Sequence, residues 1–246
     1  MKSRADLLLV ARGLVESRAK ARAAIEAGGV MANGRPVLKA AELVSEDAVL
    51  DVTPAHPWVG RGALKLEHAL ATWPIMVEGR LALDVGASTG GFTEVCLAAG
   101  ARRVYAVDVG RGQLHPSLVD DPRVVSLEAF DVRDLTEVVM PEAPQLVVCD
   151  VSFIGLAKAL PAALELAAEG ADLVALVKPQ FEVGPERVGK GGQVKDAAAR
   201  AEALEGVRAF LEAAGWAIQA TTDSPIEGGD GAREYLVWAQ KNGRPR

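Results

Sequence analysis

The sequence predicts an α/β fold with a Rossmann-like, mostly parallel sheet of seven strands, preceded by a small α+β module. From about residue 60 onward, strand-length apolar runs alternate with helical stretches, which is typical of a parallel sheet covered by helices on both faces. A glycine-rich turn follows the first of these runs, and the residues before 60 lack the alternation. The expected strands are residues 81–85, 104–107, 124–127, 146–149, 173–177, 216–220 and 235–238.

Length and local composition place a domain boundary near residue 58. A chain of 246 residues can hold one large core and a small companion domain. Pro54 and Pro57 lie in a polar stretch that is typical of a linker. We therefore expect domains of residues 1–58 and 59–246. No apolar run could span a bilayer, and Arg12 interrupts the N-terminal apolar patch, so we expect a cytoplasmic protein without a signal peptide or membrane association.

The first helix is expected at the very start of the chain. Ser3, with Asp6 three residues later, is typical of a helix N-cap, and apolar residues follow at helical spacing. These residues are Leu7, Val10, Ala11 and Leu14. The sequence therefore predicts a helix that begins near residue 3 and buries this face.

The second helix is expected after Ser17, and it carries a basic face. The formal net charge of the chain is −6, yet the first thirty residues hold six basic and three acidic side chains. Arg18 and Arg22 lie four residues apart, on one side of the helix, and Arg4 and Lys20 add to the local charge. The inward face would hold Ala21, Ala24, Ile25 and Gly28. The basic face is either a solvated helix surface or a contact surface for nucleic acid.

A hairpin completes the N-terminal module. Asn33 and Gly34 separate the strand-like residues 30–32 and 35–37, and residues 49–52 would close a small sheet. The segment SRAKARAAIEAGGVMANG resembles the S4 RNA-binding domain, and the resemblance covers about the first 55 residues. It implies that Arg4, Arg18, Lys20 and Arg22 contact structured RNA through its phosphates.

The segment LALDVGASTGGFT, residues 81–93, predicts a cofactor cradle of strand, glycine turn and helix. Its spacing is not G-x-G-x-x-G, and Asp84 precedes the glycines, where it would repel the pyrophosphate of a dinucleotide. The positive amino and sulfonium groups of S-adenosylmethionine suit this carboxylate better. The cofactor-binding residues expected here are Asp84, Gly86, Ser88, Gly90, Gly91 and Phe92.

Two further carboxylates follow later strands. Asp108 ends the second strand, where it can accept hydrogen bonds from both ribose hydroxyls of the cofactor. Asp131 could reach the adenine amino group, or it could cap a short helix that contains Arg133 and Asp134. The sequence leaves these two roles for Asp131 open.

The residues after the fourth and fifth strands bear on the acceptor of the methyl group. The segment CDVSF lacks the Asn/Asp-Pro-Pro-aromatic pattern of enzymes that methylate exocyclic amines. Methylation of a base carbon needs a cysteine nucleophile at the site. Cys149 would point to the opposite side of the strand from Asp150, which argues against that reaction. Cys149 and Cys96 have no partner at metal-binding spacing, so we expect buried free thiols, no disulfide and no metal.

A ribose hydroxyl is a poor nucleophile that must be oriented and relieved of its proton. Lysines held among carboxylates can do this, and Lys65, Asp150, Lys178 and Glu234 could supply such a group. Taken singly, Lys65 is more often a solvated helix residue, and Glu234 could be an edge-strand charge. Lys178 and Asp150 each follow an apolar run, at the edge of the sheet where ligands bind.

In order and context these four residues resemble the Lys-Asp-Lys-Glu tetrad of FtsJ-like ribose 2′-O-methyltransferases. The whole chain is similar to the haemolysin A (TlyA) family, in which an S4 domain precedes such a catalytic domain. The motifs that carry this resemblance are RGALKLEHAL, LDVGASTGGFT, YAVDVGRGQL, CDVSFI, LVKPQFE, VGKGG and REYLVW.

The resemblance implies a class I S-adenosylmethionine-dependent methyltransferase that modifies the 2′-hydroxyl of a cytidine in ribosomal RNA. The chain resembles the short form of the family, which implies action on the large ribosomal subunit, and we expect a monomer. The glycine-rich segment 181–192 either contacts RNA through Arg187 and Lys190 or is only a connector. The alternatives are an inactive RNA-binding factor in ribosome assembly and a membrane-active haemolysin.

Overall fold

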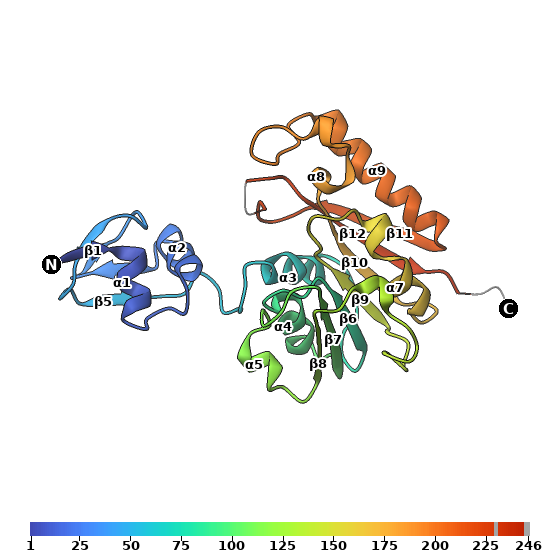
Figure 1. Cartoon of the computed structure of the whole chain (residues 1–246), viewed down its shortest axis with the longest axis horizontal. Coiled ribbons are helices and arrows are strands. Elements are labelled where there is room, and N and C mark those ends of the chain that lie inside the picture. Colours follow the sequence, from blue (N-terminus) through green and yellow to red (C-terminus); the bar gives the residue numbers. More distant parts are fainter. Residues whose placement is uncertain (229–230, 244–246) are drawn as a thin grey trace. The chain divides into compact units, whose positions relative to one another are not determined.

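The computed structural model describes residues 1–228 and 231–243 of the chain. It divides into two compact units, Met1–Pro57 and Trp58–Arg246. Each unit has its own hydrophobic core, and Figure 1 labels their elements in chain order.

The N-terminal unit combines two helices with two small antiparallel sheets. One sheet pairs β1 with β4, and the other has the order β3-β2-β5. Asn33 and Gly34 join β2 to β3 with φ values of 49° and 74°, so the predicted hairpin is confirmed. The bounds are β1 Lys2–Arg4, α1 Ala5–Ala11, α2 Arg18–Glu26, β2 Val30–Ala32, β3 Arg35–Pro36, β4 Leu43–Ser45 and β5 Leu50–Val52.

The first helix differs from its prediction in both start and orientation. Ser3 does not cap it, because Ser3 lies in β1, opposite Val44 of β4, and its hydroxyl donates to Glu46. The helix buries Ala5, Asp6, Leu8 and Leu9 instead of the expected face. Leu7 is 44% exposed. Strand pairing with a segment forty residues away therefore overrides the local capping signal.

The second helix agrees with its prediction except at Gly28, which lies beyond the end of the helix and is exposed instead of buried. Ser17 accepts a hydrogen bond from the backbone N–H of Lys20 and caps the helix. The buried side chains are Ala21, Ala24 and Ile25. Arg22 is exposed on the outer side.

The C-terminal unit contains, within the described residues, a seven-stranded sheet in the order β11-β12-β10-β9-β6-β7-β8. All seven predicted strands are confirmed. Strands β6 to β10 run parallel, and β12 is antiparallel to both β10 and β11. Their bounds are β6 Leu81–Val85, β7 Arg103–Asp108, β8 Val124–Glu128, β9 Leu146–Cys149, β10 Asp172–Val177, β11 Trp216–Asp223 and β12 Tyr235–Lys241.

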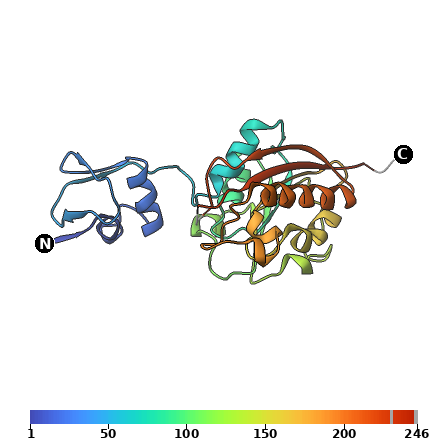
Figure 2. The ribbon, with the colours of Figure 1, turned by 90° about the horizontal axis from the view of Figure 1, so that it is seen from above.

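Helices cover both faces of this sheet (Figure 2). One face packs on α3, α4 and α5, and the other packs on α6, α7 and α9. The bounds are α3 Ala63–Thr72, α4 Gly91–Ala98, α5 Pro116–Val119, η1 Val132–Asp134, α6 Leu156–Ala159, α7 Pro161–Leu166, α8 Pro179–Glu182, η2 Pro185–Arg187 and α9 Ala197–Ala213. A parallel sheet covered in this way buries every residue of a central strand, as in β6.

The sheet brings the ends of several strands to one edge. Parallel strands β6, β7, β9 and β10 end there, so Asp108, Asp150 and Lys178 follow at the same side. Because β12 is antiparallel to β10, it begins at that edge: Tyr235 pairs with Val177. Glu234 is thereby placed beside the end of β10.

Candidate functional site

The turn after β6 has the backbone shape that its glycines predict. Gly86 and Gly90 have φ values of 84° and 93°, and Ser88 adopts 47°. A Cβ at Gly86 would lie 2.8 Å from the carbonyl oxygen of Asp150. The turn therefore requires glycine both for its dihedral angles and for close approach to the neighbouring loop. Gly91 then begins α4.

Asp84 lies behind this turn and does not line either cavity of the site. It is fully buried, and its Oδ2 accepts a hydrogen bond from the Thr93 hydroxyl at 2.6 Å. Burial raises the pKa of Asp84 to about 7, partly offset by the hydrogen bond from Thr93. Alternation along β6 turns this side chain toward Thr93 of α4, and contact between Asp84 and a cofactor stays a prediction.

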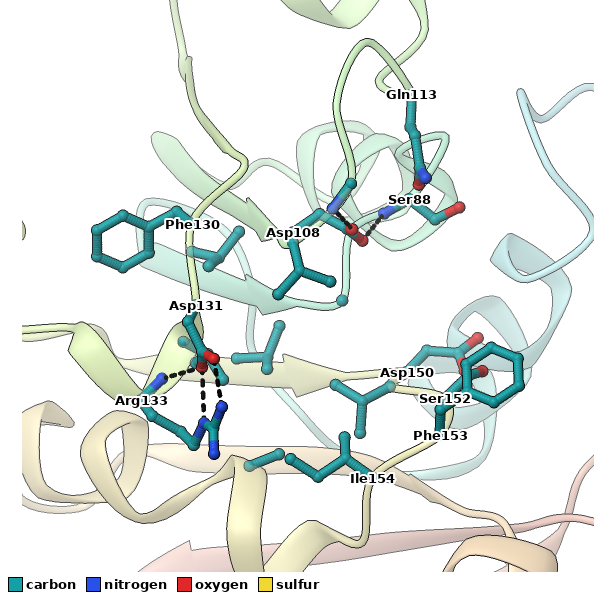
Figure 3. Close-up of a pocket in the computed structure, with 18 residues that line it drawn as sticks. Ser88, Asp108, Gln113, Phe130, Asp131, Arg133, Asp150, Ser152, Phe153 and Ile154 are labelled. Carbon is teal, nitrogen blue, oxygen red and sulfur yellow. Dashed lines mark hydrogen bonds and ion pairs between the residues drawn. The ribbon is translucent and has the colours of Figure 1, made fainter.

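A cavity of about 550 Å³ opens at the carboxyl ends of β6, β7 and β9 (Figure 3). Asp108 lies on its wall, and its two carboxylate oxygens accept hydrogen bonds from the backbone N–H groups of Ser88 and Gly110, each at 2.7 Å. These bonds fix the carboxylate while leaving lone pairs on both oxygens.

Asp131 also lines the large cavity, on the side of β8. It caps η1 by accepting from the backbone N–H of Arg133, and it pairs with the guanidinium of the same residue at 2.6 Å. The hydrogen bonds from Arg133 lower the pKa of Asp131 to about 2. The capping role is therefore present in the structure, and contact with adenine stays a prediction.

The four predicted catalytic side chains meet in one cluster. Lys65 Nζ lies 2.6 Å from Glu234 Oε2 and 3.8 Å from Asp150 Oδ2. Lys178 Nζ lies 2.5 Å from Asp150 Oδ1. Lys65 is 6% exposed, Lys178 8% and Glu234 4%. Lys65 is thus not a solvated helix residue, and Glu234 is not an edge-strand charge, because β12 lies between β10 and β11.

The cluster balances its own charge. It joins two ammonium groups and two carboxylates in the order Glu234, Lys65, Asp150 and Lys178. A buried charge without a partner is costly, so each lysine depends on the carboxylate beside it. The arrangement holds a lysine amine at the edge of the site, where it can meet a hydroxyl group.

A smaller cavity of about 210 Å³ adjoins this cluster and reaches the N-terminal end of α4. Its wall includes Lys178, Arg61 and the glycine turn. It shares four lining residues with the large cavity, namely Gly86, Ser88, Asp150 and Ser152. The two cavities therefore meet beside the lysine and carboxylate cluster. No group of three or more His, Cys, Asp or Glu side chains within residues 1–228 and 231–243 is arranged to hold a metal ion.

Comparison with known families assigns the chain. Residues 58–241 match the model of the FtsJ-like methyltransferase family. The chain belongs to this FtsJ-like family. Residues 3–50 of the same chain match the S4 domain. Both resemblances noted in the sequence are confirmed.

Relatives of this FtsJ-like chain match along nearly its whole length. The 16S/23S rRNA (cytidine-2′-O)-methyltransferase TlyA of Mycobacterium tuberculosis is 47% identical, over 96% of this chain and 89% of the relative. Hemolysin A of Brachyspira hyodysenteriae is 39% identical, over 95% of this chain and 98% of the relative. A solved structure of a candidate hemolysin from Streptococcus thermophilus has a TM-score of 0.78 and 40% identity, and covers 99% of this chain and 90% of its own. The haemolysin A resemblance is thereby confirmed. None of the described helices is long and apolar enough to cross a bilayer.

Two residues of the FtsJ-like site were missed from the sequence. Ser152 lines both cavities, and its Oγ accepts a hydrogen bond from Lys178 Nζ at 2.8 Å. Phe153 lines the large cavity, is 91% exposed and has a φ of 67°. The centroid of its ring lies 5.3 Å from the centroid of the Phe181 ring. Both follow Asp150 in the segment CDVSF, whose position after a buried strand was the available signal.

The N-terminal arginines are less free than the sequence indicated. Arg4 and Arg18 both donate to the buried carboxylate of Asp6. Their hydrogen bonds, that of Arg4 foremost, hold the pKa of Asp6 well below its usual range. Lys20 pairs with Glu16 at 2.7 Å. Arg4 and Arg18 thus have a structural partner besides any contact with RNA.

The other predicted RNA-contacting residues, Arg187 and Lys190, belong to the C-terminal unit. Arg187 is in η2 and pairs with Glu202 of α9 at 2.5 Å. Lys190 is exposed in the glycine-rich segment that follows. A role in RNA contact stays a prediction for both. Cys96 and Cys149 are free and buried, as expected, and burial raises the pKa of both thiols.

Proposed function

We propose that this chain transfers a methyl group from S-adenosylmethionine to the 2′-hydroxyl of a cytidine in ribosomal RNA, and that its target lies in the large subunit. The observation that carries the proposal is the cluster of Lys65, Asp150, Lys178 and Glu234, in which Asp150 lines both cavities and Lys178 lines the smaller one. The Mycobacterium tuberculosis relative, at 47% identity, bears the name of such an enzyme.

The residues present fit S-adenosylmethionine. The large cavity, of about 550 Å³, has the volume of a small-molecule site, and Asp108 offers acceptors for the ribose hydroxyls. The smaller cavity has backbone N–H groups at the start of α4, where a carboxylate is stabilised by the helix dipole. We therefore assign the adenosine part to the large cavity and the methionine part to the small one. When bound, the cofactor supplies an electrophilic methyl group.

The cluster supplies the acid–base chemistry. Lys178 acts as the general base, and its Nζ accepts the proton of the acceptor hydroxyl. Asp150 lies against that nitrogen at 2.5 Å and stabilises the ammonium that forms. Lys65 contacts Asp150 from the other side and is itself paired with Glu234, so the cluster carries no net charge once the ammonium of Lys178 has formed. Orientation of the hydroxyl in this rigid setting accounts for a large part of the expected rate.

The product of the reaction tests the proposal. Purified protein, labelled S-adenosylmethionine and unmethylated ribosomal subunits are incubated together, and the RNA is digested to nucleosides. We expect the label in 2′-O-methylcytidine from the large subunit. A base-methylated nucleoside would refute the role of the cluster. Label in small-subunit RNA would refute the restriction to the large subunit alone.

The N-terminal unit is proposed as the RNA-binding part, and Arg22 tests it. Arg22 is exposed on α2. We expect Arg22→Glu to weaken binding to ribosomal RNA. The slope of log affinity against log salt concentration should also become shallower by about one or more, because each lost phosphate contact means that fewer counterions are released. The measurement is a titration of RNA binding at several salt concentrations. Arg18 is a poorer choice, because its replacement also disturbs Asp6.

The matched control reverses a different exposed charge in the same unit. Lys39→Glu changes the net charge by the same amount, and Lys39 lies outside the helices. We expect it to change binding much less than Arg22→Glu. Equal effects from both variants would show that only total charge matters and would reject a defined basic face.

A further inference from the structure

Ser152 lies beside Lys178 and Asp150 but has no role in the reaction proposed above. It follows Asp150 by two residues in the loop after β9 and lines both cavities where they meet. Its Oγ accepts a hydrogen bond from Nζ of Lys178, which follows β10, at 2.8 Å. A hydroxyl group thus links the loops that carry Asp150 and Lys178.

Further contacts join the two segments that follow β9 and β10. The ring centroids of Phe153 and Phe181 lie 5.3 Å apart, and the ring planes form an angle of 51°. Glu182 accepts a hydrogen bond from the backbone N–H of Leu156 at 2.9 Å. The hydrogen bond from Lys178 to Ser152 therefore lies between two segments that other contacts also hold together.

The nitrogen of Lys178 has three positions besides its carbon bond. Asp150 Oδ1 lies 2.5 Å from this nitrogen, and Ser152 Oγ lies 2.8 Å from it. In the neutral amine two positions are N–H bonds and the third is the lone pair. The hydrogen bond to Ser152 holds one N–H, and Asp150 Oδ1 lies against the nitrogen as an ion-pair partner on a second side. The remaining position is then left to the lone pair and is available to a substrate.

We propose that Ser152 is a positioning residue, which directs the lone pair of Lys178 toward the acceptor hydroxyl. This inference rests on the proposed function. In the transfer, the acceptor oxygen bonds to the methyl carbon as the carbon–sulfur bond breaks, and the hydroxyl proton moves to Nζ of Lys178. The sulfonium charge disappears as the ammonium charge forms, so charge and protons balance.

The first test is the kinetics of Ser152→Ala and Ser152→Thr. We expect Ser152→Ala to lower kcat about tenfold, the effect of one lost hydrogen bond to a charged group, with little change in KM for S-adenosylmethionine or RNA. Ser152→Thr keeps the hydroxyl and should restore most of kcat. Ser126→Ala, at an exposed position of β8, is the matched control and should leave kcat unchanged.

The second test asks whether Ser152 acts through Lys178. In the Lys178→Ala background, adding Ser152→Ala should lower the remaining rate no further, because the group it positions is absent. An equal tenfold loss in both backgrounds would overturn the inference. So would a raised KM for S-adenosylmethionine with normal kcat, which would make Ser152 a cofactor contact. A wild-type protein that makes no 2′-O-methylcytidine would instead reject the proposed function itself.

Discussion

Replacing Lys178 with alanine is expected to lower the rate of methyl transfer about 10²- to 10⁴-fold, the usual contribution of a positioned general base. The variant loses the amine that lies 2.5 Å from Asp150, on a residue that lines the smaller cavity. Binding of S-adenosylmethionine should be retained, because the proposed cofactor contacts lie on the glycine turn and Asp108. Calorimetry for cofactor binding and single-turnover transfer to ribosomal RNA measure the two effects separately.

Lys178→Arg is the control for this prediction. Arginine keeps the positive charge beside Asp150 but does not lose its proton near neutral pH. We expect it to be as inactive as the alanine variant. Activity restored by arginine would mean that only the charge matters, and loss of cofactor affinity in either variant would place Lys178 in cofactor binding instead.

Replacing Lys65 with methionine is expected to destabilise the C-terminal unit by about 3–5 kcal/mol, the cost of leaving a buried charge without its partner. Glu234 is 4% exposed, and its Oε2 lies 2.6 Å from Lys65 Nζ. All four tryptophans lie in this unit, so unfolding in denaturant can be followed by their fluorescence. The tryptophans are Trp58, Trp73, Trp216 and Trp238.

A second substitution separates stability from catalysis. In Lys65→Met with Glu234→Gln both charges are gone, and most of the lost stability should return while methyl transfer stays impaired. Lys158→Met, on the exposed side of α6, is the matched control and should change the free energy of unfolding by less than about 0.5 kcal/mol. A double variant as unstable as Lys65→Met would show that the loss comes from packing and not from the unpaired carboxylate.

The predicted catalytic residues were recognisable for a simple topological reason. Parallel strands end at one edge of a sheet, so a polar residue after a buried apolar run is a candidate ligand-facing residue, as at Asp150 and Lys178. Glu234 fits this rule only because β12 is antiparallel and begins at that edge. Its contact with Lys65 spans 169 positions of the chain, which no local pattern encodes.

Two predicted binding residues have structural partners that the sequence did not indicate. Asp84 stands before the glycines as expected, but alternation along β6 turns it toward α4 and Thr93. Arg18 has the helical position expected of it, yet Asp6 of α1 binds its guanidinium at 3.0 Å. In both cases the sequence indicated the position of the residue correctly, and a neighbour from another element determined its partner.

The sequence by itself determined the seven strands, the second helix, the hairpin and the glycine turn. Each depends on residues close in the chain: apolar runs, a capping Ser17, Asn33 with Gly34 and glycines at positive φ. Only the tertiary structure decided the sheet order, the strand at residues 2–4, the burial of Lys65 and the hydrogen bond from Lys178 to Ser152. These features depend on contacts between segments that are distant in the chain. There the free energy gained by burying side chains and hydrogen-bonding their polar groups outweighs the local conformational preference of each segment.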